Sequence, residues 1–148
     1  MVLKQKIFMA VILTVLLFLC GACTAVEPTQ EDNLEDITWT LELYGEKNAL
    51  KAVLAGTKIT ATFESAKGQL RGSAGCNQYF ADYELSDGKL SVLNAANTER
   101  ACLDPEGVME QEQQYLSILR AAESYRIQHN KLLIDCGDSE LIFITTEE

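Results

Sequence analysis

The chain has 148 residues, which is enough for one compact domain, and its 12 basic and 22 acidic side chains give a net charge of −10. Such an acidic surface repels phosphate backbones, so the composition argues against a nucleic-acid-binding protein. It also repels anionic lipid head groups, so any attachment to a membrane must come from another feature of the chain.

The first 22 residues are typical of an export signal. Two lysines precede a 14-residue run, Ile7 to Cys20, that is apolar apart from one threonine. The run is short for a membrane-spanning helix and suits a signal peptide. Residues 21–23 then read "GAC", and small residues before a cysteine resemble the signal of bacterial lipoproteins. We expect acylation of Cys23 as the mature N-terminus, with ordinary secretory cleavage near Ala22 or an uncleaved anchor as alternatives.

Residues 23–36 are expected to form a lipidated N-terminus and a disordered acidic tether. The stretch "TAVEPTQEDNLED" holds five acids and few apolar residues, so it cannot bury a core. After removal of residues 1–22, the mature chain keeps 10 basic and 22 acidic residues, a net charge of −12. Membrane attachment would therefore depend on acyl chains. The folded domain is expected to span residues 37–148.

The first half of that domain reads as antiparallel strands. Strands are indicated where apolar and polar residues alternate and turn residues follow. "SDGK" contains Asp-Gly, which indicates a hairpin between neighbouring strands. The expected segments are strands at 37–45 and 58–64, a loop at 48–56, a long or broken strand at 69–85, and a hairpin turn at 86–89 leading into a strand at 90–92.

The second half contains the one expected helix. Asp104 can cap a helix, Pro105 suits its first position, and an apolar stripe follows at helical spacing, which places the helix at about Pro105 to Glu123. Strands are expected again at 124–129, 131–136 and 140–146, with turns at His129-Asn130 and Gly137-Asp138. The sequence therefore predicts an α+β fold: a curved, mostly antiparallel sheet of about seven strands packed around one α-helix.

Several segments, in order, resemble a META domain of the HslJ type. They are "LRGSAGCNQYFADYELSDGKLSV", "NTERAC", "VMEQEQQYLSIL", "YRIQHNKLLI" and "LIFI". These contain the Gly-Cys-Asn-x-Tyr, Thr-x-x-Ala-Cys and Met-Glu-x-Glu elements of that family. The resemblance covers about residues 37–144. It implies a curved sheet around one helix, a bacterial envelope location and an association with heat shock and novobiocin resistance, but no catalytic residues.

Three cysteines lie in the exported domain, and an oxidising compartment favours disulfides. Cys76 and Cys102 both fall in the segments that resemble the family, which makes them the candidate pair. A bridge between them would stabilise the fold by roughly 3–4 kcal/mol. Cys136 is in phase with inward residues and reads as a buried small hydrophobe. The rival pairing joins Cys136 to Cys102, and the sequence does not choose between them.

The "GCNQY" segment, residues 75–79, is the candidate site. Its favoured interpretation is a structural corner, in which Asn77 bonds turn backbone through its side chain and Tyr79 packs its ring while reaching a hydrogen bond. The alternative is a ligand or partner contact at Asn77 and Tyr79. Cysteine catalysis would need a base, and the only histidine is His129 in an expected turn.

No other catalytic or metal pattern is evident. Ser73 lacks the spacing of a nucleophile elbow, and one histidine without paired cysteines indicates no metal site or cofactor. The acids at 106, 110 and 112 are interpreted as the exposed, dipole-favoured end of the helix.

The sequence thus predicts a non-enzymatic, lipid-anchored envelope protein. Its domain would bind a small ligand or an envelope protein in the stress response, on the periplasmic or extracellular side. A structural protein-interaction lipoprotein and an enzyme with an unrecognised site are the alternatives. No oligomeric state is predicted.

Overall fold

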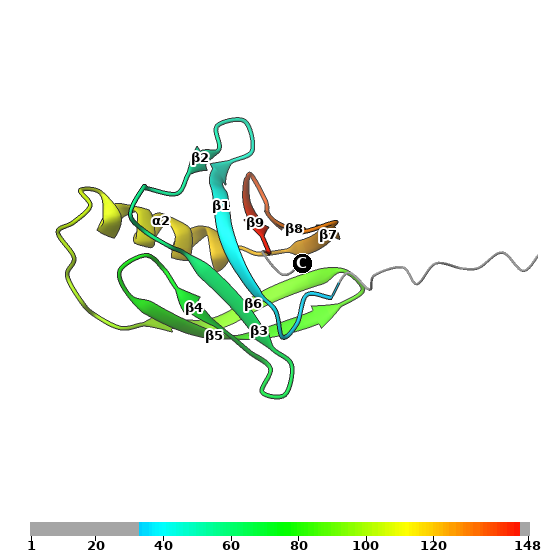
Figure 1. Cartoon of the computed structure of the whole chain (residues 1–148). Coiled ribbons are helices and arrows are strands. Elements are labelled where there is room, and N and C mark those ends of the chain that lie inside the picture. Colours follow the sequence, from blue (N-terminus) through cyan, green and yellow to red (C-terminus); the bar gives the residue numbers. More distant parts are fainter. Residues whose placement is uncertain (1–32, 146–148) are drawn as a thin grey trace, which may run out of the picture. The chain divides into compact units, whose positions relative to one another are not determined.

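The computed structural model describes residues 33–145, which form nine strands and one helix. The elements in chain order are β1 (Thr38–Glu46), β2 (Lys51–Ala52), β3 (Thr60–Glu64), β4 (Gln69–Ser73), β5 (Gln78–Ser86), β6 (Lys89–Asn97), α2 (Val108–Leu119), β7 (Ser124–Gln128), β8 (Lys131–Cys136) and β9 (Ser139–Ile144). The expected α+β class, with a mostly antiparallel sheet and a single helix, is confirmed within these residues (Figure 1).

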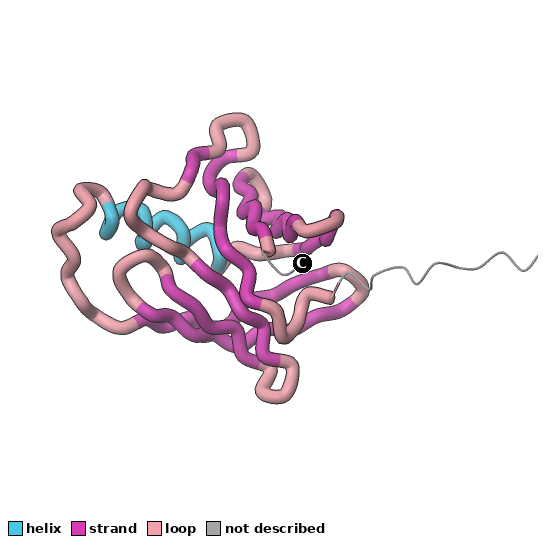
Figure 2. The backbone as a smooth tube through the Cα atoms, viewed as in Figure 1, coloured by secondary structure: helices cyan, strands magenta, loops and turns pink. Residues whose placement is uncertain are grey.

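All strands belong to one sheet in the order β2-β1-β3-β4-β5-β6-β7-β8-β9, and β9 pairs back onto β1. The sheet therefore curves until its two ends meet. The joint between β6 and β7 is weak, because the two strands share a single residue pair, Lys89 with Ser124. The helix packs against β1 and β9, and a loop of residues 98–107 connects β6 to its start (Figure 2).

The sheet has nine strands instead of the expected seven for two local reasons. The segment 69–85 is a hairpin of β4 and β5, and the segment 48–56, expected as loop, contains the two-residue strand β2 on the edge of β1. The Asp-Gly hairpin is confirmed: Asp87 and Gly88 have φ of 49° and 77° and connect β5 to β6.

The folded domain begins earlier than the expected boundary at Ile37. Leu34 is 3% exposed and belongs to the core. Its carbonyl accepts a hydrogen bond of 3.0 Å from the indole N–H of Trp39. The end of the acidic segment is thus anchored by one buried leucine. The sequence did not predict this burial, because charged residues surround Leu34 in the chain. The expected signal peptide, Cys23 and most of the tether lie outside the described residues.

The helix is shorter than expected at both ends. Gly107 occupies the position before the helix with φ 86°, a left-handed conformation that suits glycine, and no side chain caps the helix there. Asp104 is therefore not the cap, and the first helical residue is Val108. The helix ends at Leu119, and the chain then turns, with the N–H groups of Ala121 and Ala122 bonded to the carbonyls of Ile118 and Leu119.

The apolar face of the helix is core, as the spacing predicts. Tyr115, Leu116 and Leu119 are at most 4% exposed. The Tyr115 ring meets Tyr79 edge-on at 5.6 Å between centroids and Phe143 at 6.4 Å. The helix thereby fills the space inside the curved sheet, and its axis is fixed relative to β5 and β9.

Replacement of Leu119 by alanine should lower the melting temperature sharply. A buried Leu→Ala change costs about 2–5 kcal/mol, because it removes apolar contacts and leaves a cavity. Ser117→Ala on the exposed face of the same helix is the matched control and should change stability by less than about 0.5 kcal/mol. Equal melting temperatures of the two variants would contradict the assigned core.

Candidate functional site

The "GCN" segment forms the tip of the β4–β5 hairpin and packs against the first turns of α2. Ser73 pairs with Gln78 at the end of the ladder, and the Ala74 N–H donates to the Asn77 carbonyl at 2.8 Å. Residues 74–77 therefore turn tightly, and Cys76 and Asn77 are brought inward, with exposed fractions of 8% and 2%. The expected structural corner is present.

The buried carboxylate of Glu112 holds this corner to the helix. Its Oε2 accepts hydrogen bonds from the backbone N–H groups of Cys76 (3.3 Å) and Asn77 (2.7 Å), and its Oε1 accepts one from Asn77 Nδ2 (2.7 Å). Glu112 is only 4% exposed. Burial of a carboxylate is costly unless donors replace the lost water, and three N–H groups do so here.

The interpretation of Glu112 as an exposed residue at the helix end is therefore wrong. The signal that could have located it is helical phase. Glu112 lies four residues after Val108 and three before Tyr115, on the stripe that faces the sheet. The charge of Glu112 suggested exposure to solvent, whereas its position on the helix predicts that it faces the interior of the domain.

The Asn77 side chain connects the corner to the loop after β6. Its Oδ1 accepts from Thr98 Oγ1 (2.8 Å) and from the Arg100 N–H (2.7 Å). Its Nδ2 donates to the Arg100 carbonyl (3.0 Å) as well as to Glu112. Both amide hydrogens and both acceptor positions are engaged. Asn77 is thus a buried structural residue that holds the neighbouring loop in place, and its side chain is not accessible to a ligand.

Tyr79 has a similar supporting role on the other side of the corner. Its hydroxyl donates to the Thr60 carbonyl at 2.9 Å and lies 2.8 Å from the Tyr115 hydroxyl. Burial raises the pKa of both tyrosines well above the ordinary value, so both stay neutral. Gly72 makes this geometry possible, because a Cβ there would lie 1.9 Å from the Thr60 oxygen.

A disulfide joins Cys76 to Cys102 and so ties the hairpin tip to the loop that precedes α2. The candidate pairing is confirmed, and the rival pairing with Cys136 is not formed. Arg100 Nη2 donates to the Cys76 carbonyl at 3.4 Å, and the Cys102 N–H approaches the Met109 sulfur at 3.4 Å. The loop is thereby fastened at two successive points.

Cys136 is a free, buried thiol. Burial, assisted by nearby acids, raises its pKa to about 12, so the thiol remains protonated at physiological pH. This fits the expectation of a small apolar side chain in the core.

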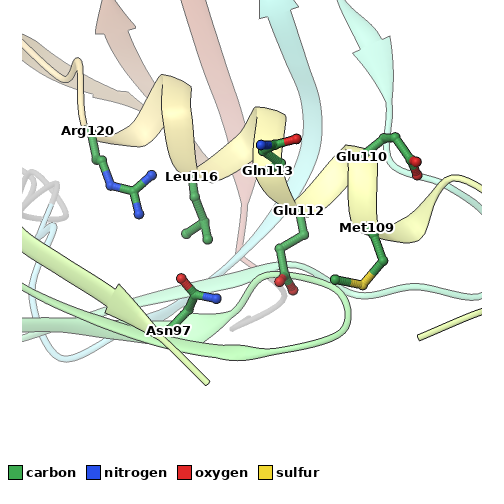
Figure 3. Close-up of a pocket in the computed structure, with 7 residues that line it drawn as sticks. All are labelled: Asn97, Met109, Glu110, Glu112, Gln113, Leu116 and Arg120. Atoms are coloured by element: carbon green, nitrogen blue, oxygen red, sulfur yellow. The ribbon is translucent and has the colours of Figure 1, made fainter. Parts of the chain in front are cut away.

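An open groove of about 480 Å³ lies beside the helix and shares Glu112 with the network described above. Figure 3 shows the side chains of Met109, Leu116 and Arg120 extending from α2 toward Asn97 on β6. The lining combines apolar, amide and charged groups from Asn97, Met109, Glu110, Glu112, Gln113, Leu116 and Arg120. We call this feature the α2–β6 groove.

The remaining candidates lie apart from the groove. The Ser73 hydroxyl accepts a hydrogen bond from the Gly75 N–H at 3.3 Å. His129 occupies the exposed β7–β8 turn with φ 57°. No hydrogen bond in the described part of the chain joins His129 to Cys76 or to Ser73.

Two features of the described residues bear on metals and membranes. Between residues 33 and 145, no group of three or more His, Cys, Asp or Glu side chains is placed to hold a metal ion. Within the same range, no helix has both the length and the apolar character needed to cross a bilayer.

The fold and site define a small α+β domain in which a curved antiparallel sheet surrounds one helix and a cysteine-linked hairpin tip. The META domain family model matches residues 32–148, and the chain belongs to this family. Among proteins with curated descriptions, none matches this chain.

Solved structures share the fold. A protein from Burkholderia xenovorans, determined by NMR, is 27% identical with a TM-score of 0.66, over 78% of this chain and 85% of that one. A crystal structure of a DUF4847 family protein from Bacteroides vulgatus is similar in fold alone, with 15% identity and a TM-score of 0.57 over 80% of this chain and 98% of that one.

Cysteine labelling should separate the two kinds of cysteine in the domain. Native protein treated with iodoacetamide at pH 8 should leave Cys136 unmodified, because the thiol is buried and protonated. After denaturation without reductant, Cys136 should be labelled, while Cys76 and Cys102 are recovered as one linked peptide pair. Mass spectrometry of the digests is the readout. Rapid native labelling of Cys136, or a Cys102–Cys136 peptide, would contradict this assignment.

Proposed function

We propose that this protein is a non-enzymatic binding module of the bacterial cell envelope, held at the membrane by acyl chains on Cys23. The export signal and the "GAC" segment before the acidic stretch support the anchoring. The Cys76–Cys102 disulfide suits an oxidising compartment outside the cytoplasm. The acidic tether would let the domain reach partners near the membrane surface on the periplasmic or extracellular side.

The observation that carries the binding role is the α2–β6 groove. One wall is a helix whose position is fixed by Glu112, and Glu112 is bonded to the hairpin tip at Cys76 and Asn77. The loop at the end of the groove is held by the disulfide and by Asn77. A wall fixed before binding loses little conformational entropy when a ligand arrives.

The groups that could serve in catalysis at this site are already engaged. Cys76 and Cys102 are joined to each other, so neither is available as a thiolate nucleophile. Both oxygens of Glu112 accept N–H donors, which ties that carboxylate to a structural role. A passive binding function therefore fits this geometry better than acid–base or nucleophilic chemistry.

A second candidate function is structural contact with other envelope proteins. Exposed apolar side chains favour it: Phe80 and Leu93 on the neighbouring strands β5 and β6 are 54% and 42% exposed, and Leu103 in the loop before α2 is 93% exposed.

Complementation in a strain that lacks the chromosomal copy tests the groove. HslJ-type proteins are associated with novobiocin resistance, so growth with novobiocin is the readout. Gln113→Trp should fill the groove and fail to restore growth. Ala66→Trp places the same ring in the exposed β3–β4 turn, away from the residues that line the groove, and should restore it. Circular dichroism should show both variants folded, and equal restoration of growth would contradict the proposal.

The anchoring is tested in the same strain. Cys23→Ser should shift the protein from the membrane fraction to the soluble fraction or leave it unprocessed, and mass spectrometry of the wild type should find an acylated N-terminal cysteine. An unmodified N-terminus in the wild type would overturn the anchor and leave the groove test unaffected.

A further inference from the structure

Most of one edge of β6 has no strand partner. The strand pairs with β5 along its length, but with β7 only at Lys89 and Ser124, followed by a hydrogen bond of 3.1 Å from the Leu90 N–H to the Glu123 carbonyl. Beyond Leu90, the described residues place no strand on that side. The helix lies on this side at the end of the strand, where Asn97 lines the α2–β6 groove.

The alternation of an antiparallel ladder identifies which backbone groups of β6 point away from β5. Leu90 directs its N–H away from β5, so Val92, two residues further along, does the same. At the other end, the Thr98 N–H bonds back to the Gln78 carbonyl at 3.0 Å, so the backbone of Asn97 points the opposite way. Unpaired strand edges of this kind are templates for another extended chain.

The opposite wall supplies side-chain recognition. Figure 3 shows Asn97 beneath Leu116, with Met109 further toward the N-terminal end of the helix, and the Leu90 N–H bonds the Glu123 carbonyl just past the C-terminal end. Eleven residues at a rise of 1.5 Å give a groove of about 16 Å, which accommodates roughly five residues of extended chain at 3.3 Å each. The exposed side chains of this wall are charged at Glu110 and Arg120, and Leu116 closes the bottom of the groove.

We propose that the groove binds an extended peptide segment of a partner protein, which adds to β6 as an antiparallel strand; this inference rests on the proposed binding function. The edge presents the N–H groups of Val92 and Asn97 on either side of the bulge at Asn94, and a polypeptide backbone is their natural complement. Antiparallel addition continues the line of β7 and places the C-terminal side of the peptide near Arg120. A basic side chain of the peptide would lie near Glu110, which is exposed.

Charge favours a foreign peptide over a second copy of the chain. Residues 33–145 contain 10 basic and 17 acidic side chains, a net charge of −7, so two copies repel each other and a basic segment is attracted.

The probe for the test is a synthetic nonapeptide selected from a phage-displayed library against the full chain in detergent. Each residue of this peptide is then N-methylated in turn, and binding is measured by fluorescence anisotropy. Strand addition predicts that methylation at alternate residues weakens binding roughly tenfold or more, while methylation at the intervening residues is tolerated. Amide hydrogen exchange at Val92 and Asn97 should also slow roughly tenfold on binding.

Two variants complete the test. Arg120→Glu should weaken binding of the nonapeptide, whereas Lys51→Glu on β2 changes the net charge equally and should not. Asn97→Pro removes an N–H that points away from β5, so it should spare the fold and block the peptide.

Three outcomes would overturn the proposal. The first is equal binding affinity for all N-methylated peptides, and the second is an amide exchange rate at Val92 and Asn97 that the peptide does not change. The third is a dimer in sedimentation that Asn97→Pro disrupts, because a second copy of the chain would then be the occupant. If any of these occurs while Gln113→Trp still fails to restore growth, the groove functions and only the strand-addition mode is wrong. If Gln113→Trp restores growth as well, the proposed function itself fails.

Discussion

A carboxylate that leaves water must find donors to replace its hydration, and this constraint organises the domain around Glu112. The donors come from a hairpin tip 35 residues earlier in the chain, through two backbone N–H groups and the Asn77 amide. Any movement of the helix away from the tip would leave the charge without partners. The apolar packing of Tyr115 and Leu119 draws the helix into the sheet, and the Glu112 contacts fix where along the sheet it rests.

This junction also determines the surface that we interpret as functional. The Asn77 side chain, which is bonded to Glu112, also forms hydrogen bonds to the Arg100 backbone in the loop after β6. The disulfide holds the same loop at Cys102. The helix is thereby held near the end of β6 but forms no strand pairing with it. The edge of β6 beyond Leu90 has no strand partner in the described domain. The groove therefore lies directly beside the buried Glu112 and the contacts that hold it.

Features that depend on local pattern could be predicted from the sequence. The Asp87-Gly88 hairpin follows from turn chemistry, and the buried stripe of α2 follows from its period. Features that depend on distant contacts could not. Glu112 looked exposed because it is charged, and its donors lie on another element. The Cys76–Cys102 disulfide was predicted only through the resemblance to the META family, because the residues alone left Cys136 as a rival partner for Cys102.

A double-mutant cycle between Asn77 and Glu112 tests the central role of this junction most directly. Asn77→Ala, Glu112→Ala and the double variant would be unfolded in urea, with Glu110→Ala as a control for loss of an exposed acid. We expect a coupling free energy of about 1.5–3 kcal/mol, as for a buried hydrogen bond to a charged group. Additive effects, with Glu112→Ala no more destabilising than Glu110→Ala, would show that the buried carboxylate does not hold the domain together.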